Sequence, residues 1–403
     1  MYDAIVVGAR CAGSPTAMLL ARKGYRVLLL DKARFPSDTL SVHYIHQPGV
    51  ARLKRWGLLD RVVASNCPPV RRQRLDFGPF ALQGTPPPAD GVADGYGPRR
   101  TVLDKLLVDA AAAAGAEVRE RFTVDDLVMD GERVTGVCGH AAGGATVTEE
   151  ARIVVGADGL HSLVARHVQA PAYDVRPTFT CAYYAYWSDL PLAGAELYVR
   201  PERMVLAGPT NDRQSLIIVY WPIAAFREVR TDVEGHFLKA LALVPDLAER
   251  VRAGTRTERF RGTGDLPNFF RTPYGPGWAL VGDAGYHKDP ITAQGITDAF
   301  RDAELLSEAI DDGFAGRRPL AEALADYERR RNETVRPLYE LTSQFAALQP
   351  PDPEMQHLLT ALRGNQEQID RFLGTVVGTV PIPEFFAPEN LGRIIGGAQA
   401  AAA

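Results

Sequence analysis

The sequence predicts an α/β fold. A discontinuous domain built on a parallel sheet carries an inserted β-sheet domain and is followed by a helical C-terminal region. Three observations predict this arrangement. About the first sixty residues alternate short apolar runs with stretches of helical spacing, as in a βαβ unit. Residues 171–264 contain strand-like segments rich in aromatic side chains. From residue 277 the strand-to-helix pattern returns, and most of the later chain has helical spacing.

The N-terminal strand, helix and strand form the first unit. Residues 3–7 (DAIVV) are a short apolar run typical of a buried parallel strand. Residues 14–24 (SPTAMLLARKG) have helical spacing, with Pro15 in the first turn and Gly24 as a natural end. Residues 25–31 (YRVLLLD) are a second buried strand. The length of this unit is that expected for nucleotide binding.

The remaining elements follow the same signals of periodicity and glycine stops. In chain order, we expect helices over 48–57 and 101–115, a meander of short strands over 117–153, a buried strand over 151–159, one helix over 233–254, a long helix from about 294, and further helix to about 378 before a proline-containing tail.

This order of elements predicts three parts. The parallel-sheet domain takes residues 1–73, 98–170 and 265–330. The inserted β-sheet domain takes residues 74–97 and 171–264, and the helical C-terminal region takes residues 331–403.

The composition is that of an ordinary globular protein. The 403 residues include 45 basic and 49 acidic side chains, so nucleic acid is not expected as a partner. No apolar stretch approaches the roughly 18 residues of a membrane span, and no secretion signal is present. The four cysteines lie far apart, which favours neither a zinc site nor a disulfide framework. We expect a cytoplasmic protein that binds no metal, membrane or nucleic acid.

A glycine-containing loop joins the first strand to the first helix. Gly8 and Gly13 occupy the first and third positions of a G-x-G-x-x-G pattern, and Arg10 occupies the middle one. A helix N-terminus behind such a loop offers free N–H groups to a pyrophosphate, and the Arg10 guanidinium could face phosphate or solvent. Asp31 lies 18 residues beyond Gly13, where a carboxylate accepts hydrogen bonds from ribose hydroxyls. Taken alone, the loop fits a plain strand-to-helix turn equally well.

Two further segments join a buried strand to a helix through glycine and aspartate: VVGADGLHSLVAR (154–166) and WALVGDAGYHKDPITAQGITDAFRDAELL (278–306). With the loop, and in this order, they resemble the class A FAD-dependent monooxygenases, the p-hydroxybenzoate hydroxylase-like family, which is related to flavin-dependent halogenases and geranylgeranyl reductases. The resemblance spans roughly residues 1–345. It implies that the parallel-sheet domain is a Rossmann-like FAD-binding domain of the glutathione-reductase type.

The resemblance also implies which residues bind FAD. They lie in the pyrophosphate loop, at the ribose aspartate, at an arginine that opens a helix, in an Asp-Gly motif, in a Gly-Asp motif beside the ribityl chain, and in a turn along the isoalloxazine. These residues are Gly8, Arg10, Cys11, Ala12, Gly13, Asp31, Lys32, Arg34, Arg100, Asp158, Gly159, Gly282, Asp283, Pro290, Gly295 and Ile296. A helix beginning near Gly295 would direct its positive end at the pyrimidine edge of reduced, anionic flavin. Cys11 is interpreted as a small helix residue rather than a redox centre.

The activity implied by the resemblance is monooxygenation. NADH or NADPH reduces FAD, oxygen forms a C4a-hydroperoxyflavin, and one oxygen atom passes to a hydrophobic or aromatic small molecule, such as a secondary metabolite, by hydroxylation or epoxidation. The chain has no second strand–GxGxxG–helix unit. That gap fits class A enzymes, which bind NAD(P)H transiently on the FAD domain, and fits equally an enzyme supplied by a partner flavin reductase.

Aromatic residues on the strands over 179–187 and 216–221 are predicted to form an apolar substrate pocket. They are Tyr184, Tyr186, Tyr220 and Trp221. His43, His46 and His287 are the candidates for proton transfer, because imidazole titrates near neutral pH. A structural role is the commoner one for any such histidine.

Two alternatives remain open. Flavin-dependent halogenases carry a W-x-W-x-I-P run and a lysine that relays hypohalous acid. Here the corresponding strand has only Trp221 and Pro222, and the only lysine between residues 41 and 100 is Lys54, in a predicted helix. These departures disfavour halogenation. A reductase of isoprenoid double bonds shares the loop and the Gly-Asp segment, and substrate-dependent oxygen consumption would distinguish it.

Overall fold

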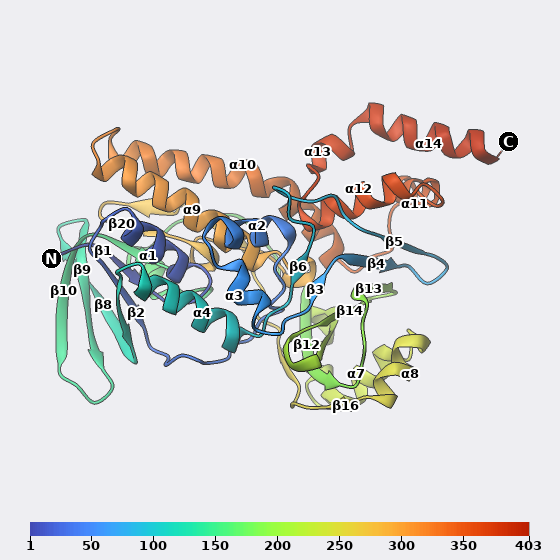
Figure 1. Ribbon diagram of the computed structural model, residues 1–403, viewed down its shortest axis with the longest axis horizontal. Coiled ribbons are helices and arrows are strands. Elements are labelled where there is room, and N and C mark those ends of the chain that lie inside the picture. Colours follow the sequence, from blue (N-terminus) through green and yellow to red (C-terminus); the bar gives the residue numbers. More distant parts are fainter. Residues whose placement is uncertain (403) are drawn as a thin grey trace.

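A parallel sheet forms the centre of the first domain (Figure 1). In this computed structural model, which describes residues 1–402 and the side chains of residues 1–397, its strands run in the order β19-β20-β10-β1-β2-β7. Neighbours pair in parallel except β19 with β20. The strands are β1 (Tyr2–Val7), β2 (Val27–Asp31), β7 (Glu117–Glu120), β10 (Thr146–Gly156), β19 (Tyr274–Gly275) and β20 (Trp278–Leu280). The predicted α/β class is confirmed.

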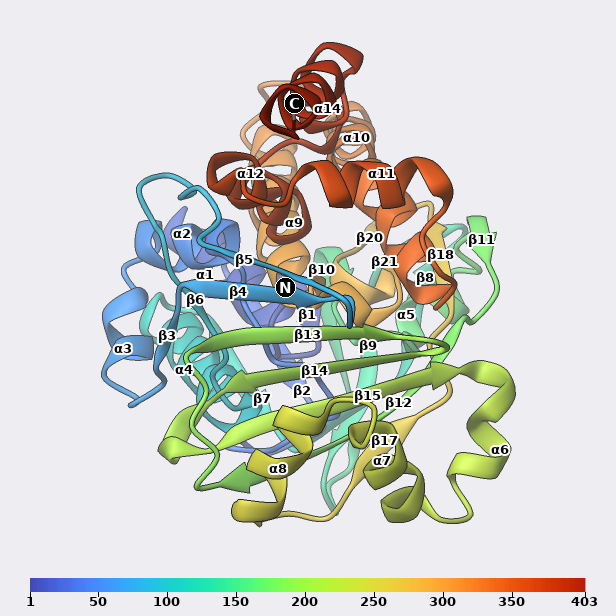
Figure 2. The same ribbon diagram turned by 90° about the vertical axis from the view of Figure 1, so that its right-hand side faces the viewer.

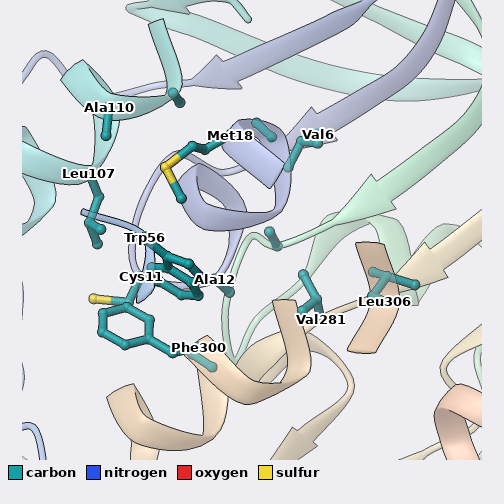
Figure 3. Close-up of a cluster of buried hydrophobic side chains, with 14 of the residues drawn as sticks. Val6, Cys11, Ala12, Met18, Trp56, Leu107, Ala110, Val281, Phe300 and Leu306 are labelled. Atoms are coloured by element: carbon teal, nitrogen blue, oxygen red, sulfur yellow. The ribbon is translucent and has the colours of Figure 1, made fainter. Parts of the chain in front are cut away.

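Helices bury their apolar stripes against this sheet. The first-domain helices are α1 (Gly13–Arg22), α2 (Gln47–Arg55), α3 (Leu59–Val63), α4 (Arg100–Ala113), α5 (Leu163–His167) and α9 (Gly295–Phe314). Figure 3 shows Met18 of α1, Leu107 of α4 and Phe300 of α9 in one cluster, and all three are almost fully buried. Each large apolar side chain of this kind stabilises the fold by about 1.5–3 kcal/mol.

The predicted meander is present as β8 (Phe122–Asp130), β9 (Arg133–Ala141) and the first half of β10. Residues 146–150 of β10 pair with β9, whereas its second half pairs with β1. The expected separate strand over 151–159 is therefore the continuation of one long strand.

The insert is a second sheet, in the order β16-β12-β15-β14-β13-β4-β5, with β17 on β12 (Figure 2). Its strands are β4 (Arg72–Asp76), β5 (Ala81–Gly84), β12 (Thr180–Ser188), β13 (Gly194–Arg200), β14 (Arg203–Pro209), β15 (Ser215–Pro222), β16 (Thr255–Arg256) and β17 (Arg261–Thr263). Strand β4 begins two residues before the predicted boundary at 74. The latter part of the predicted segment 74–97 leaves the sheet and pairs, as β6 (Gly95–Tyr96), with β3 (Pro69–Val70).

Helices cover one face of the insert sheet. They are α6 (Phe226–Val229), α7 (Val233–Leu241) and α8 (Pro245–Ala253). The prediction of one helix over 233–254 is wrong, because the chain leaves helical geometry at Val244, directly before Pro245. A small sheet of β11 (Ala172–Arg176), β18 (Asn268–Arg271) and β21 (Tyr286–His287) links the insert to the first domain.

The C-terminal region is helical, as predicted. Helix α10 (Leu320–Ala346) packs along α9, and α11 (Pro353–Ala361) and α12 (Gln366–Val377) lie over β4 and β5 (Figure 2). The expected tail forms two more helices, α13 (Ile382–Phe385) and α14 (Pro388–Ala402). Within residues 1–402 no helix has both the length and the apolar character needed to cross a membrane.

Candidate active site

A cavity of about 850 Å³ lies between the two sheets. Its walls come from the carboxyl ends of β1, β2 and β10, the loop between β20 and α9, and the face of β12 and β15. Open α/β sheets bind ligands at the carboxyl ends of their parallel strands. The cavity is therefore where the fold itself favours a ligand.

The loop after β1 requires glycine at two positions. Gly8 has φ +103°, and a Cβ there would lie 2.4 Å from the carbonyl oxygen of Ala157. A Cβ on Gly13 would lie 1.8 Å from the carbonyl oxygen of Gly8. Gly13 lies beneath the cavity wall rather than in it, and its role is to let α1 approach the strand closely.

Asp31, at the end of β2, lines the cavity beside this loop. One carboxylate oxygen accepts a hydrogen bond from the N–H of Ala9 at 2.7 Å, and the other accepts one from the N–H of Ala33 at 2.7 Å. These bonds fix the carboxylate, and its remaining lone pairs can accept from a hydroxyl of a bound ligand. Lys32 also lines the cavity, but Arg34 does not.

Arg10 lines the cavity, but its guanidinium is held by protein groups. It forms an ion pair with Asp104 of α4 and donates to the Ser37 hydroxyl at 3.0 Å. The buried Arg100 guanidinium donates to the same carboxylate at 3.0 Å. The fully buried carboxylate of Asp104 therefore holds the guanidinium at the cavity wall, and whether Arg10 also contacts phosphate stays a prediction.

Cys11 donates to Asp104 at 3.4 Å, and burial raises the pKa of its thiol. A thiol kept protonated in this way is a poor nucleophile and a poor redox centre. This agrees with the interpretation of Cys11 as a packing residue beside the cavity.

The Asp-Gly motif shapes the start of α5. One carboxylate oxygen of Asp158 accepts from the N–H of Leu163 at 2.6 Å, which stabilises the helix N-terminus. Its other oxygen is buried and has no hydrogen-bond partner within residues 1–402. Asp158, Gly159, His161 and Arg166 all line the cavity, so this motif offers both an acceptor and positive charge to a ligand.

The Gly-Asp motif presents an open carboxylate. Gly282 has φ +63°, and a Cβ there would lie 2.8 Å from the Cβ of Ala12. The following residue, Asp283, is exposed in the cavity and forms no hydrogen bond with the described residues. Pro290, Gly295 and Ile296 complete this wall, and α9 starts at Gly295 with its N-terminus at the cavity.

The loop before α9 also contains charged residues that sequence reasoning missed. Lys288 is buried, forms an ion pair with Asp298 of α9 and donates to the Tyr286 hydroxyl at 3.0 Å. Asp289 accepts from the Thr180 hydroxyl at 2.6 Å, and burial raises its pKa to about 6. The available signal was a lysine and an aspartate directly before Pro290, in the glycine-containing segment that joins β20 to α9.

The three candidate histidines have different surroundings. His43 and His287 line the cavity, whereas His46 lines a smaller cavity of about 40 Å³ next to it. Burial lowers the pKa of His43 to about 3 and that of His46 to about 4, so both rings are neutral near pH 7. The His287 Nδ1 is hydrogen-bonded to the carbonyl oxygen of Pro267.

The insert sheet brings only part of the predicted substrate pocket to the cavity. Tyr184 and Tyr220 line it, and the Tyr220 hydroxyl donates to the carbonyl oxygen of Pro290 at 3.2 Å. Tyr186 lies behind His43, with the rings stacked 5.7 Å apart. Trp221 does not reach the cavity, because alternate residues of a strand face opposite sides of the sheet and Trp221 packs against Phe237 of α7.

The cavity fits FAD. Its first end combines a helix N-terminus, close backbone approach at glycines and the fixed carboxylate of Asp31, a set suited to a pyrophosphate and a ribose. Its middle offers the unpartnered oxygen of Asp158 and the open carboxylate of Asp283. Its far end is the N-terminus of α9 facing Tyr184 and Tyr220 of the insert sheet, against which a planar ring can pack.

Comparisons with known proteins agree with this fit. The sequence pattern of the FAD binding domain family matches residues 1–342. The chain is 28% identical to kynurenine 3-monooxygenase of Salinispora tropica, over 84% of this chain and 78% of the relative. It is 26% identical to digeranylgeranylglycerophospholipid reductase of Methanocella arvoryzae, over 83% of each chain.

The fold also matches a solved structure over nearly its whole length. The myxobacterial chondrochloren halogenase CndH superposes with a TM-score of 0.80 at 23% identity, covering 99% of this chain and 97% of the halogenase. With 342 of its residues matched by one family and a cavity built for the corresponding cofactor, the chain belongs to the FAD-binding domain family and is an FAD-dependent oxidoreductase.

Proposed function

We propose that this protein is a monooxygenase that transfers one oxygen atom from O2 to an uncharged hydrophobic or aromatic small molecule, with electrons from NADH or NADPH. The observation that carries the proposal is the far end of the cavity. There the loop between β20 and α9 meets the apolar face of β12 and β15, including Ala182, Tyr184 and Ile218. Oxygen transfer needs a site from which water is excluded.

Each end of the cavity has its own role in the proposal. Asp31, Asp158 and Asp283 would hold the cofactor through its hydroxyl groups, and the loop glycines would admit its phosphates. Bound FAD supplies the redox chemistry and the reaction with oxygen. The N-terminus of α9 would stabilise negative charge at that end, and the aromatic strands would hold the substrate and keep out water.

The surroundings of the lysines support oxygen transfer over halogenation. Lys54 is exposed on α2 and does not line the cavity. Lys288 does line it, but its ammonium is bound to Asp298 and Tyr286. A relay lysine must offer its amine to the reacting molecules, and neither residue does so in this arrangement. Lys32 also lines the cavity, but it follows Asp31 at the end of β2, where the ribose of the cofactor is placed.

Oxygen uptake by the FAD-loaded protein tests the proposal. NADH and NADPH are supplied separately, with a flavin reductase as a third electron source, and uncharged phenols and alkenes are screened as substrates. We expect uptake that rises with a substrate and gives an oxygenated product, with little return of oxygen when catalase is added. The catalase control separates oxygen transfer from release of hydrogen peroxide.

Three results would contradict the proposal. A product formed only in the presence of chloride or bromide would assign halogenation. Saturation of an alkene under anaerobic conditions would assign a reductase. A protein that takes up FAD but gives no substrate-dependent product with any electron source would exclude both oxygen transfer and these alternatives.

A further inference from the structure

Four charged side chains form a buried cluster at the start of α9, along one wall of the large cavity. They are Lys288 of the preceding loop and Asp298, Arg301 and Asp302 of α9, and none is more than 9% exposed. Lys288, Asp298 and Asp302 line the cavity, as does Gly295, the first residue of α9. Because solvent screens a buried charge much less than a surface charge, the field of this cluster extends into the cavity.

Hydrogen bonds show how the charges of the cluster are balanced. The Asp298 carboxylate accepts from the Lys288 ammonium and, at 2.7 Å, from the Arg301 guanidinium. Arg301 is shared between two acids, because it also donates to Asp302 at 2.7 Å. One guanidinium thus faces two carboxylates, and Lys288 supplies the second positive charge. Without Lys288, and with both acids ionised, the cluster would carry a net negative charge.

Stability alone does not account for this cluster. Taking charges out of water is costly, and replacing a buried ion pair with well-packed apolar residues is often neutral or stabilising. Apolar side chains do occupy this wall, since Ile296 and Ala299 of the same helix line the cavity as well. Four charges at this position therefore point to an electrostatic effect on whatever the cavity holds.

Asp298 lies where its charge acts most directly on the end of the helix. It is an acidic residue in the first turn of α9. A helix N-terminus carries about half a positive elementary charge, which an unpaired carboxylate in the first turn would more than cancel. Burial opposes the ionisation of Asp298, but Lys288 and Arg301 lower its pKa below the usual value, so the carboxylate is charged near pH 7. Its effect on the cavity therefore depends on its partners.

We propose that Lys288 sets the reduction potential of the bound flavin. By neutralising Asp298, it leaves the N-terminus of α9 as a net positive feature of this wall, which favours the reduced, anionic flavin over the oxidised, neutral one. Lys288 acts through Asp298 and is therefore a positioning residue rather than a catalytic one. The inference rests on the part of the proposed function that places the flavin ring at α9, and it is independent of the reaction with oxygen.

A set of variants removes the positive charge, removes the negative charge and restores the balance. Lys288→Met removes the ammonium and keeps an unbranched side chain, whereas Lys288→Arg keeps the charge. Asp298→Asn removes the opposite charge, and the double variant Lys288→Met/Asp298→Asn is balanced again. Lys54→Met is the matched control, because it removes one lysine charge from an exposed position on α2 that does not line the cavity.

Anaerobic redox titration of the FAD-loaded protein against indicator dyes measures the potential in the absence of substrate. In Lys288→Met the affinity for reduced relative to oxidised flavin should fall at least about tenfold, which makes the two-electron potential about 30 mV more negative. Asp298→Asn should make the potential more positive, and the double variant should return it close to the wild-type value. Lys288→Arg and Lys54→Met should both keep the wild-type potential.

The opposite signs separate an effect of charge from a purely structural role, since loss of packing would move both single variants toward the potential of free FAD. Shifts of the same sign in Lys288→Met and Asp298→Asn, or equal potentials of Lys288→Met and Lys54→Met, would overturn the inference. If Lys288→Met does not retain flavin, a positive shift in Asp298→Asn with none in Lys288→Arg supports it, and any other result overturns it. Failure of oxygen transfer is distinguishable, because product formation is assayed separately with oxygen and substrate.

Discussion

Asp104 illustrates, at the scale of single residues, how a distant carboxylate organises the cofactor loop. It is fully buried on α4 and accepts from Arg10, Arg100 and the thiol of Cys11. Arg10 in turn donates to Ser37, which ties the chain after β2 to the loop. The arginine in the middle position of the glycine pattern is thus a structural link that also borders the cavity.

Asp104→Asn should lower the free energy of unfolding by about 3 kcal/mol, because it leaves two guanidinium groups without their buried counter-charge. Urea unfolding at constant pH measures the change. Asp109→Asn, on the same helix, breaks the exposed ion pair with Lys105 and should cost less than about 1 kcal/mol. Equal effects of the two substitutions on stability would show that Asp104 is not the buried counter-charge of Arg10 and Arg100.

Asp283→Ala should weaken FAD binding while leaving the apoprotein within about 0.5 kcal/mol of its original stability, since the side chain is exposed and makes no hydrogen bond to the described residues. Fluorescence titration with FAD gives the affinity. Glu322→Ala removes the same charge from an exposed site on α10 and should leave the affinity unchanged. Full retention of FAD by Asp283→Ala would remove this residue from the cofactor site.

The neutral state of His46 predicts a pH dependence of stability. Burial lowers its pKa from 6.5 to about 4, so in acid the unfolded chain binds a proton that the folded chain does not. The contribution of neutral His46 to stability is complete above its pKa in the unfolded chain, 6.5, and is lost as the pH falls below that value. Between about pH 7.5 and about pH 5, wild type should lose about 2 kcal/mol more than His46→Gln.

Asp289 makes an opposite contribution, because its raised pKa of about 6 makes folding more favourable as the pH falls. This contribution is the same in wild type and in His46→Gln, so it cancels when the two are compared. Urea unfolding at each pH supplies the free energies. Parallel curves for wild type and His46→Gln would show that His46 is not buried in its neutral form.

At the scale of elements, the helices and buried strands were predictable wherever periodicity and end signals agreed. Gly24, Gly57 and Gly115 mark the ends of α1, α2 and α4 as expected, and all have positive φ. Pro245 is also a sequence signal for the start of a new helix. The helical spacing of apolar residues continues on both sides of it, and this spacing predicted one helix instead of α7 and α8. Which face of a strand meets the cavity was not readable, because both faces of β12 and β15 are apolar.

Substitutions at Tyr220 and Trp221 test which face of β15 meets the cavity. Tyr220→Phe removes the hydrogen bond to Pro290 and should shift the absorption or reduction potential of bound flavin, at a stability cost of about 1 kcal/mol. Trp221→Ala should cost about 3–5 kcal/mol and leave the flavin spectrum of the folded fraction unchanged. Stopped-flow reduction measures the effect on the flavin, and urea unfolding measures the effect on stability. A flavin effect confined to the Trp221 variant would show that Trp221, and not Tyr220, faces the cavity.

At the scale of the whole molecule, the cavity is a meeting point of segments far apart in the chain. The loop after β1, the loop before α9 and the face of β12 lie together only because the insert folds back onto the first domain. The cofactor motifs could be found from sequence, because each is a local strand–turn–helix pattern. The hydrogen bond of His43 to Gly97 and the ion pair of Lys288 could not, since both depend on partners brought near by the fold.

Isotopically labelled oxygen gas tests the central claim most directly. The FAD-loaded protein, supplied with NADH or NADPH and an uncharged phenol that it binds, is allowed to turn over under labelled oxygen, and the product is analysed by mass spectrometry. The account predicts a product that contains one labelled oxygen atom. A product without the label, or one that carries a halogen or two added hydrogens in its place, would contradict it.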